Sequence, residues 1–162
     1  MRVRYLFSSR HTGTTDSSNQ HRTAYPKLAQ DVIQQADIIL QVLDIRFLQK
    51  TRNIQLEQEI KAQNKKLVQV INKADLVDIT QFQKTVDLST YRPFVILSCK
   101  KRIGRFQLRK LLKIEVKRLK LNRKAIIGII GYPNTGKSSL TNILGANKAA
   151  PAGNKPTCTA KW

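Results

Sequence analysis

The residues best suited to chemistry form the segment Gly131-Tyr-Pro-Asn-Thr-Gly-Lys-Ser138. The segment fits the pattern G-x-x-x-x-G-K-[ST], which binds phosphate when a strand precedes it and a helix follows. Its glycines allow backbone N–H groups to wrap around an anion, and a helix N-terminus favours negative charge. Lys137 is expected to reach the β- and γ-phosphates, and the Ser138 hydroxyl to hold Mg²⁺. The segment therefore predicts a nucleoside triphosphate site.

The flanking segments favour this interpretation over a chance match in a glycine-containing turn. The apolar run 126–130 is typical of a buried strand, and residues 139–144 have the composition of a helix. The residues expected to contact the nucleotide phosphates are Gly131, Asn134, Thr135, Gly136, Lys137, Ser138 and Ser139.

Two further polar segments directly follow apolar runs and suit a guanine base. Asp75, in Asn72-Lys-Ala-Asp75, can accept hydrogen bonds from the ring N1–H and the amino group of guanine, whereas adenine presents no amino group there. The Lys73 stem can cover one face of the base. Alone, this tetrapeptide is a weak signal, because Asn and Asp are common in turns.

The second segment, Ser98-Cys99-Lys100, can donate a backbone N–H to guanine O6 and cover the other face with the Lys100 stem. With the phosphate-binding segment, three motifs then follow three predicted strands. Together they predict a guanine nucleotide site that contains Asn72, Lys73, Asp75, Ser98, Cys99 and Lys100.

Four nearly continuous apolar runs must position these motifs, at residues 38–43, 67–71, 94–97 and 126–130. Such runs indicate strands buried on both faces, and helical periodicity appears between them, around Leu56 and Ile60 and again over residues 108–119. The alternation predicts an α/β fold with a doubly wound, mostly parallel sheet and flanking helices, whose ligands bind at the carboxyl ends of the strands. We expect one domain over residues 26–162, preceded by a flexible basic and polar arm over residues 1–25.

The net charge of +20 is unevenly distributed, since residues 100–124 contain twelve Lys or Arg against Glu115 alone. Such a field attracts a polyanion, and nucleic acid is the usual one. The alternative is a helix face that is merely solvated. The side chains expected to contact RNA are Arg109, Lys110, Lys113, Lys117, Arg118 and Lys120.

Other classes of function find little support in the sequence. No apolar run approaches the ~20 residues that span a bilayer, so we expect no membrane association. Cys99 and Cys158 lack metal-ligand spacing and suit reduced thiols of a cytoplasmic protein, and His11 and His21 lack partner ligands for a metal.

The order of the motifs is unusual, because the guanine segments precede the phosphate-binding loop. In this order, and in the segments Asp44-Ile-Arg46, Thr51-Arg-Asn53 and Gly131–Leu140, the sequence resembles the circularly permuted P-loop GTPases of the YlqF/YawG type. The resemblance covers about residues 28–162. It implies binding of GTP and GDP, Mg²⁺-dependent GTP hydrolysis, and a role in large-subunit ribosome assembly through rRNA or a pre-ribosomal particle.

The resemblance also implies roles that the sequence fits less well. Thr159 matches the switch threonine of the family's P-G-x-T-K segment, which implies that it holds Mg²⁺ and acts in catalysis with Lys137, but the Gly and Lys of that segment are replaced. No D-x-x-G motif occurs in the 162 residues, so we expect the outer side of the 126–130 strand to lack a partner. A GTP-binding, non-hydrolysing RNA-binding module, or an RNA-binding protein with a vestigial nucleotide site, remain the alternatives.

Overall fold

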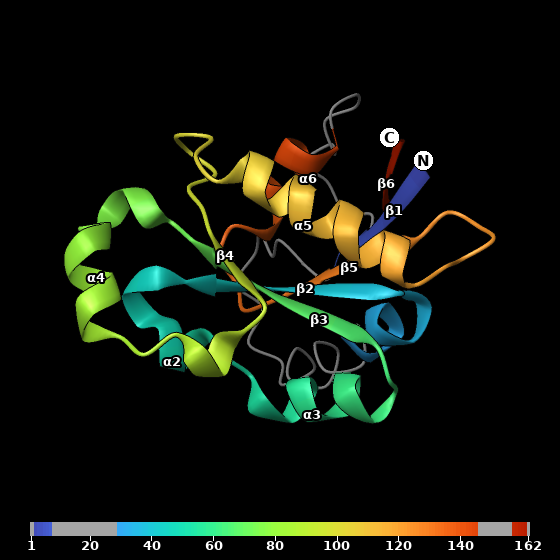
Figure 1. The fold of residues 1–162 in the computed structure, drawn as a ribbon, viewed down its shortest axis with the longest axis horizontal. Helices are drawn as coiled ribbons and strands as arrows, with labels where there is room; N and C mark the ends of the chain where they lie inside the picture. The colour runs from blue at the N-terminus through green and yellow to red at the C-terminus, as the bar shows by residue number, and fades with distance from the viewer. Residues whose placement is uncertain (1, 8–28, 146–156, 162) are drawn as a thin grey trace, which may run out of the picture.

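The computed structural model describes residues 2–7, 29–145 and 157–161, with the backbone alone for the first and last of these segments. A six-stranded sheet in the order β4-β3-β2-β5-β1-β6 forms the centre of the molecule (Figure 1). Its strands are β1 (Arg2–Phe7), β2 (Ile38–Asp44), β3 (Lys66–Asn72), β4 (Phe94–Ile96), β5 (Ile126–Ile130) and β6 (Thr157–Lys161). All neighbouring strands are parallel except β1 and β6. The predicted doubly wound, mostly parallel α/β sheet is therefore confirmed.

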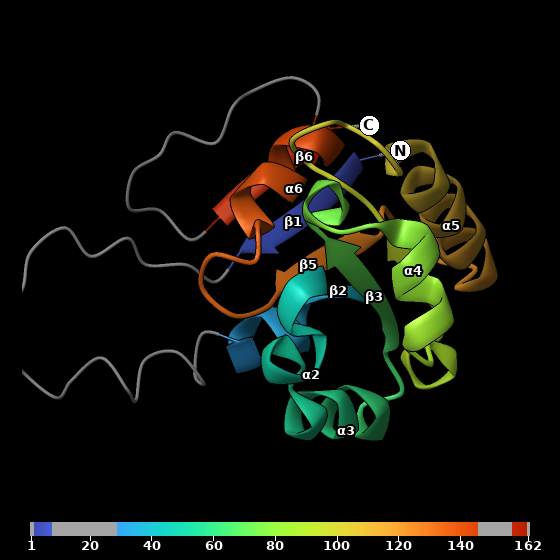
Figure 2. The same cartoon turned by 90° about the vertical axis from the view of Figure 1, so that its left-hand side faces the viewer.

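Helices cover both faces of this sheet, as Figures 1 and 2 show from two directions. Residues 29–35 are helical, and the other α-helices are α2 (Leu48–Thr51), α3 (Ile54–Ala62), α4 (Ile79–Thr85), α5 (Arg105–Arg118) and α6 (Lys137–Leu144). Short 3-10 helices occupy Ile45–Phe47, Ala74–Leu76 and Ser89–Tyr91. The helices α5 and α6 lie on one face, and α3 lies on the other with the helix at 29–35.

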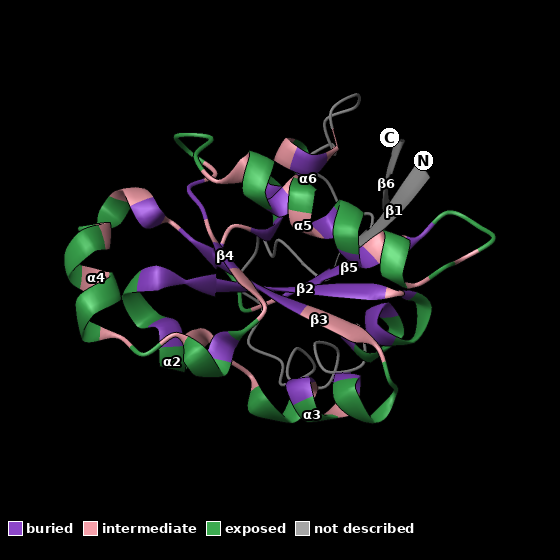
Figure 3. Ribbon diagram, viewed as in Figure 1, coloured by how far each residue is buried: buried purple, intermediate pink, exposed green. Residues whose placement is uncertain are grey.

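The alternation of side chains along β2 explains how both faces are filled. Ile38, Leu40 and Val42 pack into the cluster that includes α5 and α6, whereas Ile39 packs with Ile60 of α3 on the opposite face. Every residue of β2 is buried, as the continuous purple of this strand in Figure 3 shows. A strand covered on both sides favours a nearly continuous apolar run, and β2 has one that only Gln41 interrupts before Asp44 ends the strand.

The strand β1 differs from the predictions for the N-terminal arm and for the edge of β5. It pairs in parallel with β5, from Arg4 opposite Ile126 to Phe7 opposite Ile129, and β6 pairs antiparallel with its other side. The outer side of β5 is therefore occupied, because the N–H and C=O groups of a central strand need partners and residues 2–7 are rich in strand-forming types. Residues 8–28 of the predicted arm lie outside the described residues.

Candidate guanine nucleotide site

The phosphate-binding loop joins β5 to α6 in a backbone conformation that depends on its glycines. Gly131 has φ of +149° and Gly136 has φ of +101°, which favour glycine. Space is short at both positions. A Cβ on Gly136 would lie 2.1 Å from Nδ2 of Asn72, and one on Gly131 would lie 2.5 Å from the carbonyl oxygen of Val42. Side chains at either position would displace the loop from the strands beside it.

Lys137 begins α6 and is buried within the loop. Its Nζ donates to the carbonyl oxygen of Tyr132 at 2.8 Å, and the Thr135 hydroxyl donates to the same oxygen at 2.8 Å. Burial lowers the pKa of Lys137 to about 8. An anion beside the ammonium would offset this desolvation and favour the charged form. The other residues predicted to contact phosphates or Mg²⁺ from this loop are exposed: Asn134, Ser138 and Ser139.

Asn72 connects the three motifs that the sequence predicts to act together. Its Nδ2 donates to the carbonyl oxygen of Thr135 in the phosphate-binding loop at 2.8 Å. Its Oδ1 accepts from the backbone N–H of Cys99 at 3.1 Å. The side chain is 2% exposed, so both hydrogen bonds are shielded from water. One amide therefore fixes the loops after β3, β4 and β5 relative to one another.

Asp75 and Ser98 meet across the ends of β3 and β4. The fully buried Ser98 donates its hydroxyl to Oδ1 of Asp75, and this hydrogen bond is the main cause of a lowered Asp75 pKa. The backbone N–H of Lys101 donates to the Ser98 hydroxyl at 3.1 Å. The carboxylate of Asp75 is thereby kept ionised and oriented, which suits it to accept hydrogen bonds from a base.

Lys73 is held by a carboxylate that the sequence did not assign to the site. Lys73 has φ of +66°, and its Nζ lies 2.8 Å from Oδ2 of Asp44 at the end of β2. Arg46 forms a second ion pair with this carboxylate, and it is the main reason that the Asp44 pKa lies well below its usual range. Asp44 is the last residue of a buried strand, at the same sheet edge as the predicted motifs, and that position was the signal available to find it.

Cys99 and Lys100 complete the segment after β4. Burial raises the pKa of the Cys99 thiol to about 12, so the thiol stays protonated and its contribution is the backbone N–H that bonds to Asn72. Lys100 is exposed beside it. The structure therefore brings the base motifs and the phosphate-binding loop to one edge of the sheet.

Thr159 lies apart from this group. In β6 it is opposite Arg4, which in turn is opposite Ile126 at the beginning of β5. The phosphate-binding loop follows the other end of β5. β6 runs antiparallel along the sheet edge, and its register places Thr159 away from the loop. The roles in metal binding and catalysis that the resemblance implies for this residue stay predictions.

The basic face predicted on α5 is partly used for internal contacts. Arg109 donates from Nη2 to the carbonyl oxygen of Ile143 in α6 at 3.1 Å. Arg118 pairs at 3.0 Å with Glu115, which is itself buried. The remaining predicted residues are exposed: Lys110, Lys113, Lys117 and Lys120.

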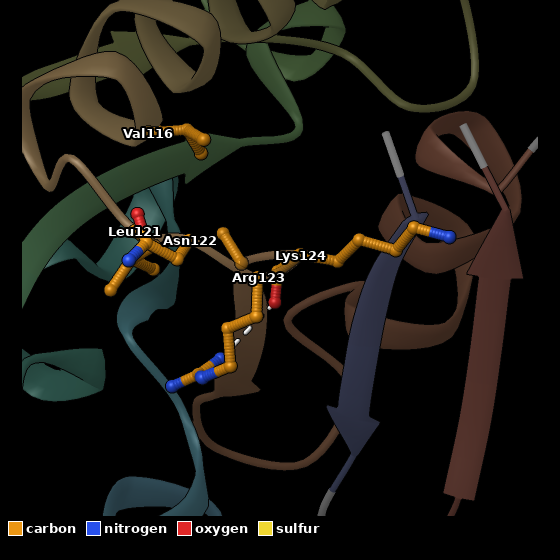
Figure 4. A pocket seen from close by; sticks show the side chains of 6 residues that line it. Val116, Leu121, Asn122, Arg123 and Lys124 are labelled. Atoms are coloured by element: carbon orange, nitrogen blue, oxygen red, sulfur yellow. Dashed lines mark hydrogen bonds between the residues drawn. The ribbon is translucent and has the colours of Figure 1, made fainter.

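A pocket of about 510 Å³ lies at the opposite end of β5 from the phosphate-binding loop (Figure 4). Its lining includes Arg123, which pairs with Asp37 at 2.7 Å. It contains none of the predicted site residues. Within the described residues, no group of three or more His, Cys, Asp or Glu could hold a metal ion, and no helix is long and apolar enough to cross a membrane.

Comparison with known proteins shows the family. A family model described as 50S ribosome-binding GTPase matches residues 126–162. An uncharacterised GTP-binding protein of Methanocaldococcus jannaschii is 40% identical over 127 residues, which are 78% of this chain and 34% of that protein. In this chain the base motifs come before the matched phosphate-binding segment. The chain belongs to the circularly permuted P-loop GTPases.

Relatives of this permuted GTPase domain also occur in Saccharomyces cerevisiae. A nuclear GTP-binding protein is 33% identical over 159 residues, which cover 85% of this chain and 31% of that protein. A nucleolar GTP-binding protein is 36% identical over 137 residues, which cover 81% and 28%. The chain thus spans about a third of the length of the curated relatives that it matches.

The fold of the permuted GTPase domain is similar to that of YlqF from Thermotoga maritima. The GNP-bound crystal structure of YlqF gives a TM-score of 0.54 at 22% identity, over 79% of this chain and 50% of that chain. A GDP-bound structure of YlqF gives a TM-score of 0.51 at 23% identity. These likenesses establish the shared fold.

Proposed function

We propose that this domain binds GTP and GDP and hydrolyses GTP with Mg²⁺, as part of large-subunit ribosome assembly. The observation that carries the proposal is the bridge through Asn72, whose amide holds the loop for the phosphates and the loop for the base in one unit. If the three motifs matched by chance, one buried side chain would not be expected to form hydrogen bonds that connect all of them.

The base would be read at the edge where Asp75 and Ser98 meet. The ionised Asp75 carboxylate accepts hydrogen bonds from guanine N1–H and the amino group, while the hydroxyl of Ser98 keeps the carboxylate in place. The stems of Lys73 and Lys100 cover the two faces of the base. Adenine would leave the carboxylate without its donors once the base covers it, and a polar group left unpaired in this way gives strong discrimination.

The phosphates would lie on the loop between Gly131 and Gly136, at the N-terminus of α6. Lys137 binds phosphate oxygens and stabilises the charge that develops as water attacks the γ-phosphate in line. Ser138, exposed beside it, would hold Mg²⁺, and the metal would neutralise part of the phosphate charge when bound. Residues 8–28 and 146–156 lie outside the described residues.

The ribosomal part of the proposal is supported by the description of the matching family and by the charge of the chain. The family is described as ribosome-binding, and residues 100–124 provide the basic surface that an RNA partner requires. The cytoplasmic location expected from the sequence stays a prediction, because two of the relatives are named for the nucleus or the nucleolus.

A binding titration with and without Mg²⁺ tests the proposal. GTP and GDP should bind in calorimetry, and ATP should bind roughly 10³-fold more weakly or worse. Phosphate release, measured alone and with large ribosomal subunits, separates a GTPase from the non-hydrolysing module. Equal affinities for GTP and ATP would overturn the assignment of the base.

A further inference from the structure

The first turn of α5 exposes an aromatic ring on the most basic part of the chain. Phe106 is 68% exposed and Ile103, just before the helix, is 57% exposed. The guanidinium of Arg105 lies over the Phe106 ring, 4.7 Å from its centroid. Leu108 and Leu112 provide the buried face of the same helix, so the core does not use this ring. An exposed ring beside cations can stack on a nucleic acid base.

The loop before α5 is a closed hairpin with a cationic tip. Ser98 and Ile103 exchange two backbone hydrogen bonds, of 3.1 and 3.2 Å, which close the loop. The exposed tip consists of Lys100, Lys101 and Arg102, and Arg102 has φ of +57°. The tip therefore holds three positive charges in a fixed turn next to Phe106.

The ring also heads a row of exposed lysines along α5. Lys110, Lys113 and Lys117 follow Phe106 at intervals of four, three and four residues, and all are exposed. Residues at such intervals lie on one face of a helix, so the row extends about 16 Å from the ring. Glu115, the one acidic residue of α5, is 4% exposed and paired with Lys66 and Arg118, so it does not oppose the charge of this row.

We propose that the hairpin tip, Phe106 and the lysine row form a site for single-stranded RNA. A base stacks on the Phe106 ring, and the following phosphates contact Lys110, Lys113 and Lys117. The positive charge of the lysine row favours a polyanion. The exposed ring favours a polyanion with unstacked bases, and the bases of a duplex are stacked on one another. This site rests on the proposed ribosomal function and goes beyond it by specifying the form of the RNA.

The same hairpin reaches into the guanine site, so the two ligands should influence each other. Ser98 closes the hairpin through its backbone and holds Asp75 through its hydroxyl. The adjacent Cys99 N–H bonds to Asn72. RNA that binds and stabilises this conformation of the hairpin also stabilises the groups that read the base. The linkage must be reciprocal, so GTP should raise RNA affinity by the factor by which RNA raises GTP affinity.

Fluorescence anisotropy with a labelled single-stranded 12-mer and a duplex of the same length tests the site. The Phe106→Ala variant should lose about 5- to 100-fold in affinity for the single strand, the range for one stacked base. Phe106→Tyr should retain the affinity. The matched control is Phe47→Ala, which removes another half-exposed ring, 5.3 Å from the Arg46 guanidinium, outside this surface.

Two further measurements separate the charges from the ring. Changing Lys110, Lys113 and Lys117 to Gln should flatten the salt dependence by about two units of slope, whereas Phe106→Ala should leave the slope unchanged. Saturating GTP should raise the affinity of the unaltered chain for the single strand about fivefold or more, and the Ser98→Ala variant should lose most of this coupling.

Tighter binding of the duplex, or undiminished binding of the single strand by Phe106→Ala, would overturn the site. Unchanged RNA affinity on addition of GTP would overturn the coupling. Binding of GTP is measured in the same samples, so a chain that binds no GTP contradicts the proposed function and not the RNA site. Melting temperatures of the variants show whether any loss arises from unfolding.

Discussion

Asn72 and Thr135 are 63 residues apart in the sequence, and the amide of the first donates to the carbonyl oxygen of the second at 2.8 Å. The loop that reads the base and the loop that binds the phosphates are thereby joined directly, before any ligand enters. Preorganisation of this kind lowers the entropic cost of binding, because the loops need not be ordered at that moment.

Removing this bridge should weaken nucleotide binding without changing the preference for the base. Asn72→Ala deletes both side-chain hydrogen bonds, and we expect a loss of about 1–3 kcal/mol in GTP affinity with a similar loss in stability. Asn142→Ala, at an exposed position of α6, is the matched control. Calorimetry and thermal melting measure the two quantities, and an unaltered GTP affinity would show that the bridge is dispensable.

Asp75 should determine which base is accepted. We expect Asp75→Asn to lower GTP affinity by ~2–4 kcal/mol, because the mispaired amide replaces a charge-assisted acceptor. Xanthosine triphosphate, which has a carbonyl in place of the amino group, should bind the variant better than GTP does. Asp78→Asn is the control, since Asp78 caps α4 and Asn is an equally good N-cap. Equal GTP affinity in the Asp75 variant and the unaltered chain would remove Asp75 from the site.

Lys137 should make nucleotide affinity depend on pH. In the folded chain its pKa is lowered from 10.5 to about 8 by burial, so between these values the unfolded chain binds more protons. The unfolding free energy of the empty chain should therefore rise with pH in this window, while triphosphate binding, which needs the ammonium, should weaken about tenfold from pH 7 to pH 9.

A Lys137→Arg variant supplies the control for this pH dependence, because arginine stays charged throughout the range. Titration of the nucleotide itself affects both proteins equally. The prediction concerns the difference between the two affinity profiles, measured by calorimetry in matched buffers. Parallel profiles would mean that Lys137 does not lose its proton near pH 8.

The pairing of β1 with β5 should contribute to stability. Tyr5→Pro removes a backbone donor from a strand that is bonded on both sides, and we expect a loss of roughly 2 to 3 kcal/mol together with self-association through the exposed edge. Thr12→Pro is the control, because it also introduces proline but at a position outside the described strands. Light scattering and melting measure the outcome, and a stable, monomeric Tyr5→Pro variant would be inconsistent with this pairing.

Substitutions of Arg109 and Lys113 should distinguish a structural role from an RNA-binding role on α5. Arg109→Gln loses the hydrogen bond to Ile143 and should lower stability by about 1–2 kcal/mol, without changing the salt dependence of RNA binding. Lys113→Gln should flatten that dependence by about 0.7 to 0.9 units and leave stability within about 0.5 kcal/mol. If Arg109→Gln changed the salt dependence and Lys113→Gln lowered the stability, Arg109 would have the binding role and Lys113 the structural one.

The sequence was sufficient to predict the strands that hold the site. Its apolar runs lie within a residue or two of β2, β3 and β4 and coincide with β5, because strands buried on both faces cannot contain polar residues without cost. The rule that ligands bind at the carboxyl ends of parallel strands then placed Asn72 and the phosphate-binding loop at one edge. The structure agrees with that placement, because the Asn72 amide bonds to Thr135 of the loop.

The parts that the sequence did not predict depend on contacts between distant residues. The helix α4 was not expected, because its seven residues contain no buried side chain and its start depends on the Asp78 cap. The contact of Lys73 with Asp44 joins the turn after β3 to the end of β2, and local sequence patterns do not reveal such pairs. Glu115 was assigned to no face, yet it is buried, and its charge is paired with Lys66 at 3.3 Å.

The position of β5 in the sheet has a consequence for synthesis of the chain. β2, β3 and β4 are neighbours in both the chain and the sheet, so they can pair as soon as they emerge from a ribosome. β5 follows them and inserts between β2 and β1. At ~5–20 residues per second, β1 remains without its parallel partner for about 6 to 25 s. The half of the fold that reads the base is thus complete before the half that holds the phosphates has been synthesised. During this interval β1 must be kept from pairing with other strands.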